Sequence, residues 1–246
     1  PKPSSAASDV YKRQTLEAGK INLDSISSLP ETNIAKQYVL NRKIPKGKHK
    51  DLFYAEDFKA FVSQFKPDYE KTLIDNDPRL IIPFRDRNKK IFAIQGRSLT
   101  NNKIRYITIK LNDSDSKIFG LDQIDVTKKI YIVEAPLDSM FLDNAIATAD
   151  SNLEFGAKVL ESYSVSKTNI TLIPDKEPRN VNIVKNIEKW INNGYTVCLL
   201  PDILIGKDIN DFILNGTTKP ELHRIIDTNS YDGIRAKLEF NSWKKC

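Results

Sequence analysis

Three apolar runs that each end beside acidic residues constrain the fold of this chain most strongly. The runs are KKIYIVEAP (128–136), NITLIPD (169–175) and YTVCLLP (195–201). Each has the length and composition of a buried strand, and the segments after the first two have the apolar spacing of helices. Strands that alternate with helices predict an α/β fold, with a parallel sheet covered by helices on both faces.

Two helices are predicted to follow the first two strands. Residues 138–149 would place Met140, Phe141 and Ala145 inward, and residues 181–194 end at Gly194, which suits the position after a helix. The third strand leads into GKDINDFILNG (206–216). Ligands of such sheets bind beyond the carboxyl ends of the strands, so the functional residues are expected there.

The residues before the first of these strands predict a separate, mixed α+β unit. Residues 15–66 show helical spacing, with Phe58, Phe61, Val62 and Phe65 on one face. Three later segments, 80–84, 91–99 and 104–111, read as an antiparallel β unit. The domains expected are a non-native or disordered leader (1–14), a basic α+β subdomain (15–126), a catalytic domain (127–216) and a helical tail (217–246).

Carboxylates stand at all three strand ends of the predicted parallel sheet. They are Glu134 and Asp138, Asp175 and Glu177, and Asp208 and Asp211. Neighbouring strands lie ~4.8 Å apart, so these oxygens can share a divalent cation, and hard oxygen ligands favour Mg²⁺ or Mn²⁺. The alternative is that each acid only caps a helix, but three such junctions in succession favour the metal site.

The charge of the chain favours an anionic partner. The net charge is +6 and the isoelectric point is about 9.1. Cations gather in NRKIPKGKHK (41–50) and in residues 85–110, although a solvated surface role stays open for each lysine. The candidate phosphate contacts in these stretches are Lys43, Lys46, Lys48, Arg85, Arg87, Arg97 and Arg105.

Several classes of protein are not expected. No apolar run approaches the ~20 residues that span a membrane, and the first residues lack the apolar centre of a secretory signal, so we expect a cytoplasmic protein. Cys198 and Cys246 are too few for a disulfide framework or a four-ligand zinc site, so zinc is not expected.

The motifs EAPLDSMFLDNA (134–145), IPDKEPRN (173–180) and GKDINDFI (206–213) resemble the three motifs of the Toprim domain in primases of T-even-type phages. The run from 79 to 122 resembles the small domain that precedes Toprim in bacterial and phage primases. The resemblance covers residues 30–215. It implies a Toprim-type sheet flanked by helices and metal-dependent synthesis of short RNA primers from ribonucleoside triphosphates. The implied partners are a single-stranded DNA template and a replicative helicase in the host cytoplasm.

The resemblance also assigns roles to single residues. Glu134 matches the glutamate of proton transfer or metal organisation, and Asp175 with Glu177 matches the metal-binding pair. The accessory acids are Asp138 and Asp208, and the cations that guide template and nascent strand are Arg97, Arg105 and, by a weaker match, Lys117, with Lys207 counted among the nucleotide-binding residues.

This chain departs from the family pattern at three positions. Ala135 replaces a Gly, Glu177 replaces an Asp, and Asn210 stands where another acid is frequent, a role that Asp211 could take. An amino-terminal zinc-binding module, which the family usually has, is not expected in this chain.

Two other activities stay open. A Toprim nuclease uses the same acids, and a non-catalytic nucleic-acid-binding or helicase-adaptor module would keep only the basic stretches. The tail after residue 217 could pack on the Toprim domain or contact a helicase.

Overall fold

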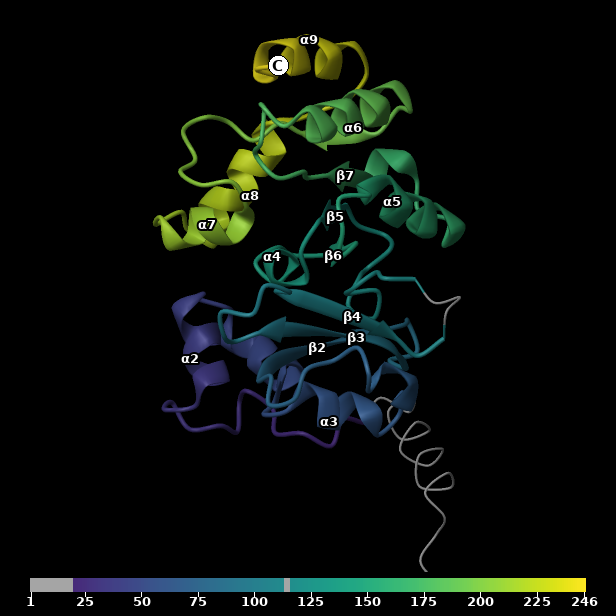
Figure 1. Ribbon diagram of the computed structural model, residues 1–246. Helices are drawn as coiled ribbons and strands as arrows, with labels where there is room; N and C mark the ends of the chain where they lie inside the picture. Colours follow the sequence, from purple (N-terminus) through teal and green to yellow (C-terminus); the bar gives the residue numbers. More distant parts are fainter. Residues whose placement is uncertain (1–19, 113–115) are drawn as a thin grey trace, which may run out of the picture. The chain divides into compact units, whose positions relative to one another are not determined.

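The chain folds into two compact units, with the boundary in the sequence between Lys117 and Ile118, in a computed structural model that describes residues 20–112 and 116–246 (Figure 1). Each unit has a sheet of its own. The predicted leader, residues 1–14, lies outside the described residues, and the finer domain boundaries stay predictions.

The first unit is built on an antiparallel sheet with the strand order β1-β2-β3-β4. Its strands are β1 (Phe53–Ala55), β2 (Arg79–Arg85), β3 (Ile91–Ser98) and β4 (Tyr106–Lys110), and its helices are α2 (Ile34–Asn41), η1 (Lys46–Asp51), α3 (Phe58–Ser63) and η2 (Pro67–Tyr69). The predicted antiparallel β unit is confirmed. The prediction of helix throughout residues 15–66 is wrong at β1, because Phe53 pairs with Ile81 at the sheet edge.

The aromatic face predicted for α3 forms the core of this unit. Phe58, Phe61, Val62 and Phe65 are all buried against the sheet. The ring of Phe58 lies so close to Gly96 of β3 that a Cβ at position 96 would come within 2.7 Å of it. Glycine at this strand position therefore allows the helix to approach the sheet.

A buried arginine joins β2 to its neighbours. Arg79 is 0% exposed, and its Nε donates to Asp77 Oδ2 at 2.6 Å. Its two terminal nitrogens donate to the carbonyl oxygens of Gly96 (2.9 Å) and Ile104 (3.0 Å), while the guanidinium lies 5.3 Å from the ring centre of Phe58. The charge is thus balanced and hydrogen-bonded inside the core.

We predict that Arg79→Leu lowers the free energy of unfolding of the first unit by about 3–5 kcal/mol, because Asp77 would keep a buried and unpaired charge. Urea denaturation followed by circular dichroism measures this change. Arg105→Leu, which alters an exposed arginine of the same unit, is the control and should change stability by less than about 0.5 kcal/mol. Equal effects of the two variants would contradict the prediction.

The second unit contains the predicted parallel sheet, with the strand order β6-β5-β7-β8-β9. Its strands are β5 (Ile130–Val133), β6 (Ala145–Ala147), β7 (Ile170–Leu172), β8 (Thr196–Cys198) and the antiparallel edge strand β9 (Ser230–Tyr231). The helices are α4 (Pro136–Ser139), α5 (Leu153–Ser162), η3 (Lys167–Asn169), α6 (Val181–Asn192), α7 (Ile209–Leu214), α8 (Lys219–Thr228) and α9 (Gly233–Trp243). The three predicted strands are confirmed and lie side by side as β5, β7 and β8.

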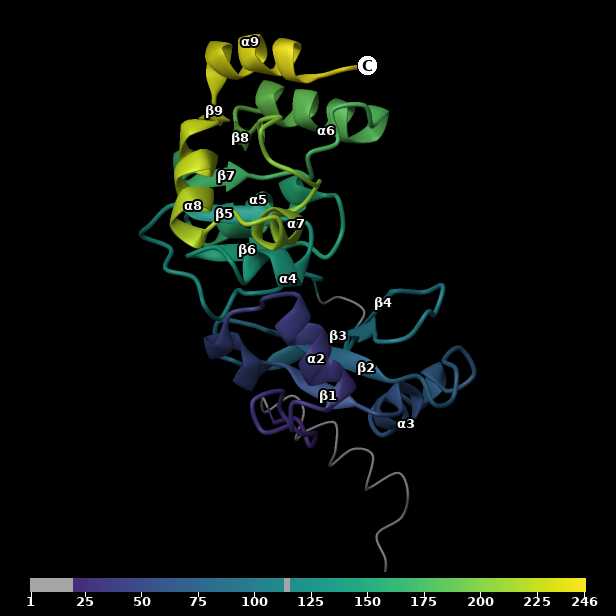
Figure 2. The same ribbon diagram turned by 90° about the vertical axis from the view of Figure 1, so that its left-hand side faces the viewer.

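Helices cover both faces of this sheet, as predicted. Figures 1 and 2 show α5 on one face and α7 with α8 on the other. Successive residues of β5 point to the two faces: Tyr131 Oη donates to Asp227 of α8 at 2.9 Å, and Ile132 packs against Gly156 of α5.

The helix predicted for residues 138–149 is wrong beyond its first turn. The helix α4 stops after one turn, and Ala145–Ala147 form β6, parallel to β5. Residues 140–142 continue as turns, and Asn144, directly before β6, adopts a left-handed φ of 57° while its side chain binds the loop around Asp125 and Lys129.

The helix α6 and the tail agree better with their sequence signals. Asn180 caps α6, and Gly194 follows the helix with a φ of +81°, as predicted. The tail supplies β9 and α9 to the second unit, and Trp243 Nε1 donates to the carbonyl of Leu200 at 2.9 Å. Of the two alternatives for the tail, the structure shows that it packs on this unit. Within the described part of the chain, no helix has the length and apolar character needed to cross a membrane.

Candidate active site

Two neighbouring strands bring Glu134 and Asp175 to the same edge of the second sheet. Glu134 directly follows β5, and Asp175 follows β7 after Ile173 and Pro174. The strands are parallel, and the pairing continues beyond β7 because the N–H of Ile173 donates to Ile132 at 2.8 Å. The backbone of Asp175 forms a hydrogen bond with the Glu134 carboxylate. The parallel register therefore places the two acids together.

Glu134 is the more unusual of the two carboxylates. Its Oε1 atom is buried and has no hydrogen-bond partner among the described residues. The pKa of Glu134 is raised to about 7, mainly by burial and also by the charges of Asp175 and Glu177, while the backbone hydrogen bond from Asp175 and the charge of Lys207 oppose this rise. A buried carboxylate with a free oxygen and a pKa near neutrality can hold or accept a proton.

Asp175 shares this environment. Burial is the main cause that raises its pKa to about 6, and the charges of Asp208 and Glu177 add to it, while Lys207 lowers it. The Lys207 ammonium lies 3.6 Å from Asp175 Oδ2 and 3.9 Å from Glu177 Oε1. One exposed ammonium thus only partly neutralises a cluster of carboxylates.

Two loops hold Lys207 beside these acids. The N–H of Lys176 donates to the carbonyl of Lys207 at 2.7 Å, and Lys176 Nζ donates to the carbonyl of Leu204. Gly206 turns the second loop with a φ of +114°, where an added Cβ would come within 2.4 Å of Asp211 Cβ. The two loops therefore position each other through their backbones.

The accessory acids Asp138 and Asp208 lie beside Asp175, and each also accepts a hydrogen bond from a backbone N–H. Asp138 and Asp208 line a small cavity together with Asp175. Asp138 is 7% exposed and accepts from the N–H of Asn210 at 2.9 Å. Asp208 also accepts from the N–H of Asp211 at 2.7 Å, so it caps α7 while it lines the cavity.

Asp211, the remaining candidate ligand, is engaged locally. Its Oδ2 accepts from the N–H of Lys207 at 3.1 Å, within its own loop. The structure therefore gives Asp211 a role in holding Lys207, and its role as a ligand stays a prediction.

Asn180 is a site residue that the sequence reasoning missed. Its Nδ2 donates to Glu177 Oε2 at 3.0 Å, while its Oδ1 accepts from Asn182 and Ile183 at the start of α6. One side chain therefore caps the helix and orients the carboxylate. An Asn directly before a predicted helix is the signal that could have identified it.

The donors of this cluster fit a divalent cation. Among the described residues, no three Asp, Glu, His or Cys side chains are already arranged so that they could hold a metal ion together. The fit rests on the buried free Oε1 of Glu134 and on the mutual repulsion that contributes to the raised pKa values of Glu134 and Asp175. Oxygen donors of this kind suit Mg²⁺ or Mn²⁺.

The predicted nucleic-acid contacts lie mostly in the first unit. Lys43, Lys46, Arg87, Arg105 and Lys117 are exposed, Lys48, Arg85 and Arg97 are half-buried, and Lys207 lies in the acidic cluster of the second unit.

Arg97 is held between two tyrosines of the first unit. Its Nε donates to Tyr38 Oη at 3.0 Å, and its guanidinium lies 5.5 Å from the ring centre of Tyr38 and 4.9 Å from that of Tyr106. Tyr106 stands opposite Arg97 in the β3–β4 register and is 40% exposed. The alternation in RYITIKL predicted the strand, but it did not indicate this stacking.

The chain is similar to a phage primase. It is 29% identical to the DNA primase of Enterobacteria phage T4 over 223 residues, which are 89% of this chain and 63% of that protein. The chain thus spans less than two thirds of this relative. No protein-family model matches the chain.

Two solved structures share the fold. The Aquifex aeolicus primase, with its zinc-binding and RNA polymerase domains, gives a TM-score of 0.66 at 20% identity over 98% of this chain and 67% of that chain. The DnaG primase catalytic domain bound to ssDNA gives 0.63 at 15% identity over 90% of this chain and 80% of that chain. The resemblance and the fold class predicted from the sequence are confirmed.

Proposed function

We propose that this chain is the catalytic part of a DNA primase, which joins ribonucleoside triphosphates into short RNA primers on a single-stranded DNA template. The observation that carries the proposal is the buried Glu134 carboxylate with its free Oε1 beside Asp175, at the carboxyl edge of a parallel sheet. The similarity to phage T4 primase over 89% of the chain supports it.

In the proposed reaction, the 3′-hydroxyl of one ribonucleotide attacks the α-phosphate of the next ribonucleoside triphosphate, the bond between its α- and β-phosphates breaks, and pyrophosphate leaves. Glu134 accepts the hydroxyl proton at Oε1, which is the atom without a competing hydrogen bond among the described residues. Lys207, at 3.6 Å from Asp175, offsets negative charge where the phosphates bind.

Asp175, Glu177 and Asp208 would hold the divalent cation, with Asp138 as a further donor from the same cavity. When bound, Mg²⁺ or Mn²⁺ supplies Lewis-acid stabilisation of the phosphate oxygens. Asn180 keeps Glu177 oriented through its 3.0 Å hydrogen bond.

The basic residues of the first unit would bind the template. Exposed lysines and arginines can contact successive phosphates, and Tyr106 offers a partly exposed ring next to Arg97. A replicative helicase is proposed as the partner on the resemblance to phage primases alone, and so is a setting in the host cytoplasm.

Incubation of the chain with single-stranded DNA, labelled ribonucleotides and Mg²⁺ tests the proposal. A primase yields short labelled oligoribonucleotides that depend on the template. A shortened template would instead identify a nuclease, and retention of the DNA without synthesis or cleavage would identify an adaptor.

For the template surface, we predict that Arg97→Ala weakens binding of single-stranded DNA and lowers the slope of log K against log salt concentration by about 1. Arg97→Lys is the matched control, because it keeps the charge while losing the flat guanidinium between Tyr38 and Tyr106. Fluorescence anisotropy at several salt concentrations measures both. An unchanged slope in Arg97→Ala would show that Arg97 does not contact a phosphate of the template.

A further inference from the structure

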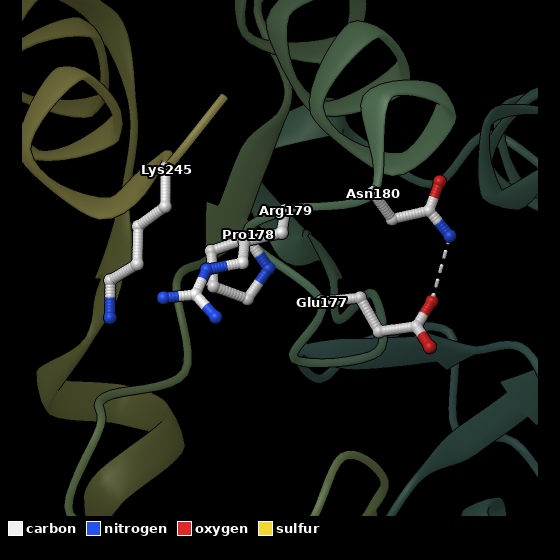
Figure 3. Close-up of a pocket in the computed structure, with 5 residues that line it drawn as sticks. All are labelled: Glu177, Pro178, Arg179, Asn180 and Lys245. Carbon is white, nitrogen blue, oxygen red and sulfur yellow. Dashed lines mark hydrogen bonds between the residues drawn. The ribbon is translucent and has the colours of Figure 1, made fainter.

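A pocket of about 580 Å³ opens beside Glu177, on the side of the turn that leads into α6. It is lined by Glu177, Pro178, Arg179, Asn180 and Lys245 (Figure 3). Its volume lies within the range of small-molecule sites, roughly 300–1,000 Å³. Of these residues, Glu177 belongs to the carboxylate cluster described above and Asn180 orients it, whereas Pro178, Arg179 and Lys245 have no assigned role.

A backbone hydrogen bond joins the two segments that form this pocket, residues 177–180 and the last residues of the tail. The N–H of Lys245 donates to the carbonyl of Pro178 at 2.8 Å, which attaches the last residues of the tail to the turn before α6. The nearby Trp243 Nε1 donates to the carbonyl of Leu200 at 2.9 Å. The tail thereby carries the Lys245 side chain to a wall of the pocket.

The pocket has one acidic and one basic end. Figure 3 shows the Glu177 carboxylate turned toward Asn180, whereas the Arg179 guanidinium points the other way, toward Lys245. Among the described residues, Arg179 has no side-chain hydrogen bond or ion pair, and its charge adds to that of Lys245 in lowering the pKa of Asp202. Lys245 Nζ pairs with Asp202 at 2.7 Å, but both side chains are exposed (41% and 73%), and such a pair is weak and easily exchanged.

We propose that this pocket binds the β- and γ-phosphates of the incoming ribonucleoside triphosphate, with Arg179 and Lys245 as their cationic contacts. The inference rests on the proposed function. A triphosphate whose α-phosphate lies on the side of Glu177 and the other carboxylates would extend its remaining negative phosphates toward the end of the pocket that holds Arg179 and Lys245. Arginine offers several fixed donors to phosphate, and lysine adds a mobile charge.

Isothermal titration of the full chain with ATP, AMP and pyrophosphate, each with Mg²⁺, tests this inference. Arg179→Gln is expected to weaken the binding of ATP and pyrophosphate by about tenfold. It should change the affinity for AMP by no more than about twofold, because AMP lacks the β- and γ-phosphates. Lys245→Gln is expected to act in the same direction, by about threefold. The matched control is Lys185→Gln, which removes an exposed charge from α6 outside the pocket and should change nothing.

Two results would overturn the inference: an unchanged ATP affinity in Arg179→Gln, or an equal loss for ATP and AMP, which would indicate a general charge effect. Primer synthesis by the wild-type chain, measured in parallel, separates the two proposals. Synthesis with an ATP affinity that is independent of Arg179 rejects the phosphate pocket alone. A wild-type chain that neither makes primers nor binds ATP rejects both.

Discussion

Glu134→Gln is expected to reduce primer synthesis by about 100- to 10,000-fold, which is the range for loss of a positioned general base. The amide keeps the size of the carboxylate but cannot accept the proton of the 3′-hydroxyl. Binding of single-stranded DNA should stay near the wild-type level, because the predicted template contacts come from other residues. Extension of labelled ribonucleotides on a template measures the loss, and fluorescence anisotropy measures the binding.

The same substitution is expected to stabilise the fold above neutral pH. The folded-state pKa of Glu134, about 7, lies above its ordinary value of 4.5, so the folded chain binds the proton more tightly than the unfolded chain does. This contribution to stability is full below about pH 4.5 and is lost as the pH rises through 7. Without divalent cations, the free energy of unfolding of Glu134→Gln should therefore exceed that of the wild type by roughly 1–2 kcal/mol at pH 8 and equal it near pH 4.5.

Glu188→Gln, an exposed carboxylate on α6, is the control for both measurements. It should leave synthesis and the pH dependence of unfolding unchanged. Full synthesis by Glu134→Gln would mean that another group accepts the proton of the 3′-hydroxyl. Stabilities of the wild type and the variant that change in parallel from pH 5 to pH 8 would contradict the raised pKa of Glu134.

The part of the site that follows from strand order could be predicted from the sequence. Each of the three apolar runs is short and ends beside an acid, and neighbouring parallel strands end at one sheet edge, so the meeting of Glu134 with Asp175 needs no further information. The antiparallel sheet of the first unit was predictable because β2, β3 and β4 follow one another along the chain as apolar or alternating segments joined by short polar turns.

Residues whose roles depend on loop backbone could not be predicted in this way. Lys207 reaches the acids because the loops around Lys176 and Gly206 hydrogen-bond to each other, and no periodicity reports such a contact. Asp211 binds the N–H of Lys207, although its spacing equally allowed a ligand role. The strand β6 was missed because its alanines carry little β propensity, and the left-handed residue Asn144 directly before it depends on contacts with a distant loop.

Asp175→Asn is expected to reduce primer synthesis by about 1,000-fold or more, because it removes one charged oxygen ligand from the cation and so loses several kcal/mol of transition-state stabilisation. It should also weaken Mn²⁺ binding, which electron paramagnetic resonance measures without any turnover. Glu134→Gln serves as the internal comparison, since it should lose synthesis while keeping more of its Mn²⁺ affinity. Asp232→Asn, an exposed acid without a side-chain capping bond at α9, controls for charge. If Asp175→Asn bound Mn²⁺ like the wild type, the cation would have to be held by other oxygens, and the grouping of Asp175 with Glu177 and Asp208 as its ligands would be wrong.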